Sequence, residues 1–294
     1  MEASEFNEQH ICYGIIMNII IVLGTIGNIL AIIVWLQPGL RNTTTATYLT
    51  ALSIADLCVL WTAIFRYETF SIFWTRWDYF MYEVTNKPYI DVYLEPFHWI
   101  ALGTTSMLTV ALTVERFLAV KFPMKIKPFC NKSVTFFIII LILITALALT
   151  IPNFFDYKII SLKPPFLNQT INIIDATDFK ETSHYTCFFH SYIIPIFWYL
   201  IPWVCLAVCN ALLIHHVRMS ARRINAVAVH DFVNMNPHRH LTRLLIAITI
   251  TYMVCNLPLC VIVIIHVKKE TENDVCEPGS ESPWGPDDPY QVAR

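Results

Sequence analysis

Charged residues are scarce in this sequence. Only 14% of its 294 residues are Asp, Glu, Lys or Arg, and 56% are hydrophobic. A soluble domain typically has about 25% charged residues. So little charge cannot cover a water-facing surface, which excludes an ordinary soluble globular protein. We therefore expect the chain to lie in a lipid bilayer.

The sequence also lacks features that other classes of membrane protein need. We find no internal repeat, whereas many six-span transporters and channels are built from inverted repeats. The histidine pairs His215–His216 and His238–His240 lack the i, i+4 spacing of a helical metal pair and have no carboxylate cluster beside them. We therefore expect neither an enzyme nor a metal or cofactor site, and no nucleic-acid partner. A six-span transporter or channel remains the alternative from another class.

Six stretches are long and apolar enough to cross a bilayer, which takes about 20 residues of helix. Each should be a helix, because an isolated strand would leave its backbone groups unpaired in lipid. The predicted fold is an all-α membrane protein with six transmembrane helices, near residues 11–36, 42–65, 91–120, 133–155, 188–217 and 240–267. Residues 1–10 are then a short extracellular N-terminus, 11–267 the bundle, and 268–294 a disordered hydrophilic tail.

Basic residues are distributed unevenly between the predicted loops. The segments 37–41, 115–132 and 218–243 hold eleven of the 20 Lys and Arg residues but only two acids, Glu115 and Asp231. Loops rich in Lys and Arg stay on the cytoplasmic side. This pattern predicts an extracellular N-terminus and places Glu115 and Arg116 at the cytoplasmic end of the third span.

Polar residues and prolines interrupt the apolar spans. Intramembrane ionisable groups are costly and usually face the bundle interior or a cavity. Asp56 in "LTALSIADLCVL" is therefore a candidate functional residue, whereas Asn28 in "GTIGNILAIIVW" is also explained as a contact between helices. Pro202 and Pro258 predict kinks in the fifth and sixth spans, and a kink can serve as a hinge.

Taken in order, these motifs resemble the rhodopsin-type (class A) G-protein-coupled receptors over about residues 14–267. The set comprises the Gly-Asn of span one, the Leu-x-x-x-Asp of span two, "ERFLAVKFP" after span three, and the prolines of spans five and six. Within that family, "MLTVALTVERFLAV", the asparagine in "LAVCNALLI" and "YMVCNLP" are similar to the invertebrate FMRFamide-receptor group.

The resemblance implies roles for several residues. Glu115 would restrain Arg116 at rest, and Arg116 would meet a heterotrimeric G protein when the sixth span swings outward. Met124 matches an apolar residue that the family inserts into the G protein, although a loop methionine also contacts its own domain. In the family, the residue that matches Asp56 holds a sodium ion. Thr105 matches one partner position and Asn28 lies nearby in the motif, but other partners belong to a seventh span. The hinge would comprise Pro202, Asn256 and Pro258.

Helix geometry points to a candidate ligand site at the other end of span three. His98 precedes Arg116 by five helical turns, or about 27 Å, and Glu95 and Asp91 precede His98 on the same face. Such an acidic column would suit a cationic ligand group, and a peptide arginine pairs with a carboxylate bidentately. Alternatively, Glu95 pairs with Arg66 and Asp91 is merely solvated.

The remaining outer residues depart from the family pattern. Cys12, Cys187 and Cys276 are predicted to be extracellular, and sequence alone leaves their pairing open. Most relatives bridge the position of Cys187 to a cysteine on top of span three, where this chain has Asp91. Asn168 in "NQT" is the predicted glycosylation site on the outer side.

The predicted function is a plasma-membrane receptor for an extracellular, amidated neuropeptide that signals to a heterotrimeric G protein. The sequence shows six spans where the family has seven. One interpretation is an incomplete chain, which the loss of likeness after Lys269 favours. The other is a genuine six-span form that does not signal and modulates full-length receptors, in which case a receptor oligomer is expected.

Overall fold

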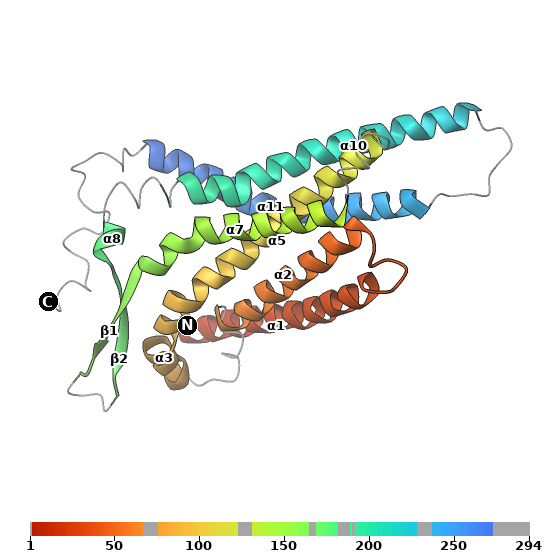
Figure 1. Cartoon of the computed structure of the whole chain (residues 1–294). Coiled ribbons are helices and arrows are strands. Elements are labelled where there is room, and N and C mark those ends of the chain that lie inside the picture. The colour runs from red at the N-terminus through yellow and green to blue at the C-terminus, as the bar shows by residue number, and fades with distance from the viewer. Residues whose placement is uncertain are drawn as a thin grey trace.

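Six long helices dominate the computed structural model (Figure 1). It describes residues 2–66, 76–122, 131–164, 169–181, 189, 192–227 and 237–272. In chain order these helices are α1 (Glu2–Trp35), α2 (Thr44–Arg66), α5 (Glu95–Lys121), α7 (Lys132–Thr150), α10 (Ile201–Val227) and α11 (Pro237–Glu272). The predicted helical membrane bundle is confirmed.

Five of these helical segments are long and apolar enough to cross a membrane, and a shorter apolar stretch, Ile246–Pro258, lies within α11. Three helices extend well beyond the predicted spans, whereas α7 ends at Thr150, before the predicted residue 155. Helix α1 begins at Glu2, α10 continues to Val227, and α11 reaches Glu272. Hydropathy marks the part of a helix that lipid can surround, whereas the backbone hydrogen bonds continue into water.

A β-hairpin, which the sequence did not lead us to expect, lies at one end of the bundle (Figure 1). Strand β1 (Tyr157–Leu162) pairs antiparallel with β2 (Ile171–Ala176). The short helices α3 (Arg76–Thr85), α4 (Lys87–Tyr89) and α8 (Asp178–Glu181) complete this part of the fold. The Asn172 side chain of β2 donates a hydrogen bond to the Thr85 carbonyl at 2.8 Å, which ties the hairpin to α3.

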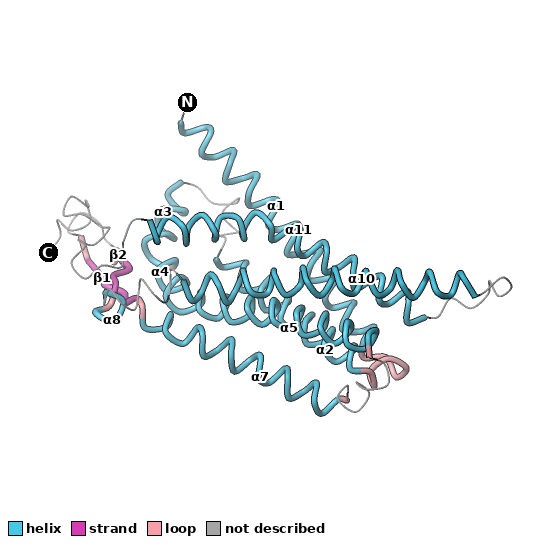
Figure 2. The backbone as a smooth tube through the Cα atoms, turned by 90° about the horizontal axis from the view of Figure 1, so that it is seen from above, coloured by secondary structure: helices cyan, strands magenta, loops and turns pink. Residues whose placement is uncertain are grey.

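The two ends of the bundle therefore differ in structure (Figures 1 and 2). We call the end with β1, β2, α3 and α8 the hairpin end, and the opposite end, where α5 finishes after Arg116, the Arg116 end. The turn between α1 and α2 lies at the Arg116 end. Two π-helical segments, Ile90–Leu94 and Ile196–Leu200, precede α5 and α10 at the hairpin end, and a 3₁₀ turn, Ile151–Phe155, follows α7.

Helix α5 is the central element, since it contacts α2, α7, α10 and α11. A buried cluster between α2 and α5 is formed by Tyr48, Leu49, Ala55, Leu108 and Leu112. Where α5 meets the fifth span, Gly103 leaves room for the buried indole ring of Trp198, and a Cβ atom at Gly103 would overlap that ring. Small residues allow such close helix approach in membranes.

Four hydroxyl side chains on α5 bond back to its own backbone. Each donates to the carbonyl oxygen four residues earlier, at 2.7–3.1 Å, and the four are Thr104, Ser106, Thr109 and Thr113. Such bonds satisfy a hydroxyl hydrogen inside an apolar environment. The hydroxyl oxygens still have lone pairs that can accept from a neighbouring helix.

Candidate functional site

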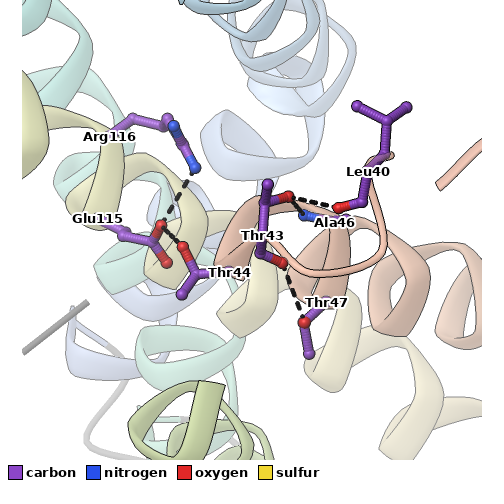
Figure 3. Close-up of polar contacts among 7 residues, drawn as sticks. All are labelled: Leu40, Thr43, Thr44, Ala46, Thr47, Glu115 and Arg116. Carbon is purple, nitrogen blue, oxygen red and sulfur yellow. Dashed lines mark hydrogen bonds and ion pairs between the residues drawn. The ribbon is translucent and has the colours of Figure 1, made fainter. Parts of the chain in front are cut away.

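The Glu115–Arg116 pair lies at the Arg116 end of α5 (Figure 3). Arg116 Nη2 is 3.1 Å from Glu115 Oε1, and the two side chains are only 16% and 10% exposed. Thr44 Oγ1, on α2, donates to the same Glu115 oxygen at 2.6 Å. The carboxylate is thus bound by two donors from two helices.

Thr44 is held in place by the way α2 begins (Figure 3). The hydroxyl of Thr43 accepts a hydrogen bond from the Ala46 amide at 3.1 Å and donates to the Leu40 carbonyl at 2.9 Å. A threonine in this position satisfies one of the unpaired amides of the first helical turn. Sequence reasoning did not identify Thr44. The N-capping threonine in "NTTTATY" could have indicated where α2 begins.

Arg116 also borders a small cavity between three helices. The cavity, of about 10 Å³, is lined by Leu112, Thr113, Arg116, Asn210, Leu213, Ile246 and Thr249. Among the described residues, Arg116 Nε is buried and has no hydrogen-bond partner. The guanidinium group is therefore incompletely satisfied in this conformation, whereas its Nη2 atom is bound to Glu115.

A larger cavity, of about 210 Å³, opens at the hairpin end. Its lining residues are Asp91, Glu95, Pro96, Trp99, Asn153, Asp156, Tyr157, Lys180 and Ile194. Three carboxylates thus meet one lysine, whose Nζ atom lies 3.4 Å from the centroid of the Tyr157 ring. Trp99 Nε1 donates to Glu95 Oε1 at 3.2 Å. The structure brings the predicted residues Asp91 and Glu95 together and adds Asp156 and Lys180.

His98 lies apart from this cavity. It is 5% exposed, and its Nδ1 atom is 2.8 Å from Thr62 Oγ1 on α2. Thr62 Oγ1 also lies 2.7 Å from the Cys58 carbonyl and 3.0 Å from the Val59 carbonyl, and the tautomer of His98 sets the direction of the His98–Thr62 bond. A residue three positions after Glu95 is about 60° away around the helix, which is enough to direct His98 to α2.

Asp56 and Thr105 also contact each other in the structure. Thr105 Oγ1 donates to Asp56 Oδ1 at 3.0 Å, which joins α5 to α2. Asn28 instead donates to the Gly24 carbonyl of its own helix at 3.0 Å. The structure thus brings together two of the three core polar residues that the resemblance implied.

The predicted hinge residues lie in α10 and α11. Pro202 is buried at the start of α10, just after a π-helical segment, and Pro258 lies inside α11. Because proline has no amide hydrogen, it cannot complete the helical bond to the carbonyl four residues earlier. Asn256 donates its side-chain amide to the Tyr252 carbonyl at 2.9 Å in the same stretch.

The structure does not describe several of the candidate residues that the sequence analysis identified. Met124, Asn168, Cys187 and Cys276 are outside the described residues, and the side chains of Cys12 and Arg66 are not described either. The alternative Glu95–Arg66 pair, the cysteine pairing and the glycosylation site therefore stay predictions.

Comparison with known proteins agrees with this architecture. The family model of the serpentine type 7TM GPCR chemoreceptor Srw matches residues 15–277. The chain is 25% identical to the FMRFamide receptor of Drosophila melanogaster over 209 residues, which is 71% of this chain and 38% of that protein. It is 21% identical to galanin receptor 2b of Danio rerio over 273 residues, or 90% of this chain and 65% of that protein.

The chain thus spans less than two thirds of the length of either relative. The predicted resemblance to the FMRFamide-receptor group is confirmed by the Drosophila relative. Because the family model matches most of the sequence, the chain belongs to the serpentine 7TM GPCR family and is a rhodopsin-type, multi-pass membrane receptor that resembles neuropeptide receptors.

Proposed function

We propose that the chain is a plasma-membrane receptor that binds an amidated peptide at the hairpin end and couples to a heterotrimeric G protein at the Arg116 end. The observation that carries this proposal is that one helix, α5, contributes to both places. Glu95 lies in the carboxylate-lined cavity, and Arg116 is bound to Glu115 at the opposite end. These positions are 21 residues apart, or about 31 Å along a helix.

The cavity at the hairpin end suits a cationic peptide group. Among the described residues that line it, three carboxylates, Asp91, Glu95 and Asp156, accompany one cation, Lys180. A guanidinium group would find planar carboxylate acceptors there. Trp99 and Tyr157 offer aromatic faces for the methylene groups or for an aromatic neighbour. The names of the two relatives, which are receptors for peptides, support this ligand class.

The Arg116 end supports the coupling role. In the structure, Glu115 and Thr44 hold Arg116 and the start of α2 together. A ligand that binds better to an open bundle would raise the population of that form. In the open form, Arg116 would leave Glu115 and be available to the G protein, while Met124 would contribute an apolar contact. No covalent chemistry is part of this mechanism.

The test is a peptide response measured on the chain as it stands. The chain carries an N-terminal tag, its surface display is confirmed, and calcium and cyclic-AMP signals are recorded for a panel of amidated peptides with and without arginine. We expect a dose-dependent response to arginine-containing peptides. Silence from a chain that reaches the surface contradicts the proposal.

Two substitutions, one inside the cavity and one outside it, then test whether the peptide binds there. Glu95→Gln should raise the half-maximal peptide concentration on the order of 10- to 100-fold, because a hydrogen bond to a charged group is lost. Asp175→Asn is the matched control, since Asp175 lies on β2, pairs with Lys158 at 3.2 Å and does not line the cavity. Equal effects of the two substitutions would remove Glu95 from the site.

A further inference from the structure

Asn153 lines the cavity at the hairpin end, and the proposed function gives it no role. It lies in the 3₁₀ turn Ile151–Phe155, which follows α7. Among the residues that the structure describes, the Oδ1 atom of Asn153 is buried and has no hydrogen-bond partner. A buried acceptor without a donor is unfavourable. A ligand that brings an N–H donor to this side chain should therefore bind more tightly than one that does not.

The turn that carries Asn153 is packed on two sides by aromatic rings. The next residue, Phe154, packs edge to face on Phe97 of α5, with ring centroids 5.3 Å apart. Phe155 packs in the same way on Phe179 of α8, at 6.5 Å. The backbone of the turn is thus held in place, whereas no bond fixes Oδ1. Because the last torsion of an asparagine side chain is soft, the amide group can turn its acceptor toward the cavity.

The charges around the cavity oppose a peptide that ends in a carboxylate. Among the described residues that line it, three carboxylates accompany one ammonium group, and they are Asp91, Glu95, Asp156 and Lys180. The ammonium group of Lys180 also lies over the Tyr157 ring, 3.4 Å from its centroid. A free carboxyl terminus would add a further negative charge to this set, and like charges repel. A terminal carboxamide is neutral and avoids that repulsion.

A terminal carboxamide is also the same chemical group as the Asn153 side chain. Each has one carbonyl acceptor and two N–H donors, so two such groups can pair through two N–H···O bonds. A carboxylate and an ester can only accept, so neither has a hydrogen to donate to Oδ1. The match is symmetric, and it therefore holds for either orientation of the Asn153 amide.

The arginine and the terminal carboxamide of one peptide can reach this cavity together. Glu95 comes from α5 and Asn153 from the turn after α7, and both line the same cavity of about 210 Å³. In a peptide that ends in Arg-Phe-amide, the two polar groups belong to consecutive residues, whose Cα atoms are about 3.8 Å apart. The guanidinium group can then pair with a carboxylate while the carboxamide pairs with Asn153.

We propose that Asn153 determines the preference of this cavity for amidated peptides, because its side chain pairs with the terminal carboxamide while the surrounding carboxylates exclude a terminal carboxylate. The proposal rests on the proposed function, since it concerns how the same cavity selects its peptide. It gives Asn153 a role in specificity and no role in signalling at the Arg116 end.

The test compares three end groups on one peptide and measures binding, not signalling. The whole chain is purified in lipid nanodiscs, and the probe is Phe-Met-Arg-Phe with an N-terminal fluorophore and a carboxamide, methyl ester or free carboxylate end. Fluorescence anisotropy gives each Kd. In the wild type, the ester should bind about 5- to 100-fold more weakly than the amide, because it brings no donor to Oδ1. The free acid should bind more weakly than the ester by about 3-fold or more.

Two substitutions of Asn153 should change this preference in different ways. Asn153→Ala should bring the Kd values of amide and ester to within about 2-fold of each other, chiefly by weakening the amide. It should leave the ratio of ester to acid within about 2-fold of the wild type, because the carboxylates remain. Asn153→Asp keeps an acceptor of the same shape and should keep the amide at least about 5-fold ahead of the ester. Ratios within one variant do not depend on how much of the chain is folded.

Asn172→Ala is the matched control. Asn172 lies on β2, donates to the Thr85 carbonyl at 2.8 Å and is not among the residues that line the cavity. Its substitution should leave the ratio of amide to ester within about 2-fold of the wild type. An equal loss of the ratio in Asn172→Ala and Asn153→Ala would show that the hairpin end as a whole, and not Asn153, sets the preference.

The remaining outcomes separate this proposal from the proposed function. If the wild type binds amide and ester equally, or if Asn153→Ala keeps the preference, the role of Asn153 is wrong and the peptide receptor stands. A free acid that binds as tightly as the amide also overturns the proposal, because Lys180 then captures the carboxylate. If none of the three peptides binds a chain that shows a thermal unfolding transition, the proposed function fails and the role of Asn153 fails with it.

Discussion

Helices α1 and α5 both have the length and composition of a membrane span, but the bundle uses them differently. In the most apolar window of each span, 6% of the α1 residues are buried inside the protein, against 50% of those in α5. Helix α1 is also the more apolar of the two. A central helix has lower hydropathy because its Ser, Thr and His side chains face protein partners, whereas a peripheral helix faces lipid.

The polar residues of the two helices show the same difference. Asn28 on α1 donates to the carbonyl of Gly24 in its own helix. On α5, Thr105, Ser106 and Glu115 contact α2, α11 and α2 respectively. Polar residues of α5 therefore define how helices are placed around it, and substitutions in α5 should have larger effects than matched substitutions in α1.

Glycine substitutions should give the largest contrast. Gly103→Ala places a Cβ atom into the indole ring of Trp198, whereas a Cβ atom at Gly27 on α1 meets nothing within 4 Å. Overpacking of this kind costs about 1–3 kcal/mol, or more where a buried ring cannot move. Gly27→Ala should be neutral or stabilising by up to about 1 kcal/mol, because alanine favours helix. Thermal unfolding of the purified chain in detergent measures both, and similar midpoints would show that α5 is not closely packed at Gly103.

A smaller effect is expected at the Arg116 end. Glu115→Gln removes the negative charge that holds Arg116, and Thr44→Val removes the second donor to the same oxygen. For this mostly buried pair, we expect a loss of about 1–2 kcal/mol from the resting form, and a rise of basal signalling on the order of 10-fold for Glu115→Gln. Thr44→Val should raise it less.

Thr47→Val is the control for Thr44→Val. The hydroxyl of Thr47 donates to the Thr43 carbonyl of the same turn at 3.2 Å and does not reach α5. It should leave basal signalling unchanged. Equal basal signals from the two threonine variants would show that the bond between α2 and Glu115 does not stabilise the resting form.

The smallest contrast compares core polar residues. Thr105→Val removes the hydrogen bond to Asp56 and should lower the stability by about 0.6 kcal/mol, the average for bonds between membrane helices, and by at most about 1.7 kcal/mol. Asn28→Ala removes a bond within one helix and should change the stability by less than about 0.5 kcal/mol. Both are read from thermal unfolding in detergent, and a larger loss for Asn28→Ala would reverse the comparison between α1 and α5.

The sequence by itself determined the class of fold and the proximity of residues that are adjacent or one helical turn apart in the chain. Hydropathy depends on composition within one segment, so the helices were predictable, although their ends were not. Glu115 and Arg116 are adjacent in the chain, and Asp91 and Glu95 are one turn apart, so their proximity followed from helix geometry. Thr105 was linked to Asp56 only through the family resemblance, and the structure places the two in contact.

Only the tertiary structure decided how each helix is rotated against its neighbours. Each residue turns a helix by about 100°, so a small change of local geometry redirects every later side chain. The π-helical segment Ile90–Leu94, whose hydrogen bonds close over five residues instead of four, lies just before Glu95 and His98. The segment affects how Asp91 lies relative to α5, whereas Glu95 and His98 both follow it on regular helix. Three residues leave those two side chains about 60° apart, so His98 faces α2 although sequence reasoning grouped it with the cavity.

The contacts that sequence reasoning missed are those between distant segments. Thr44 and Glu115 are 71 residues apart, and Ser106 and Tyr252 are 146 residues apart. The β-hairpin was missed as well, because hydropathy of span length does not register strands of six residues. Hydropathy is a property of a segment and can be read along the chain, whereas these contacts depend on how several helices pack at once, which the sequence of any one helix does not specify.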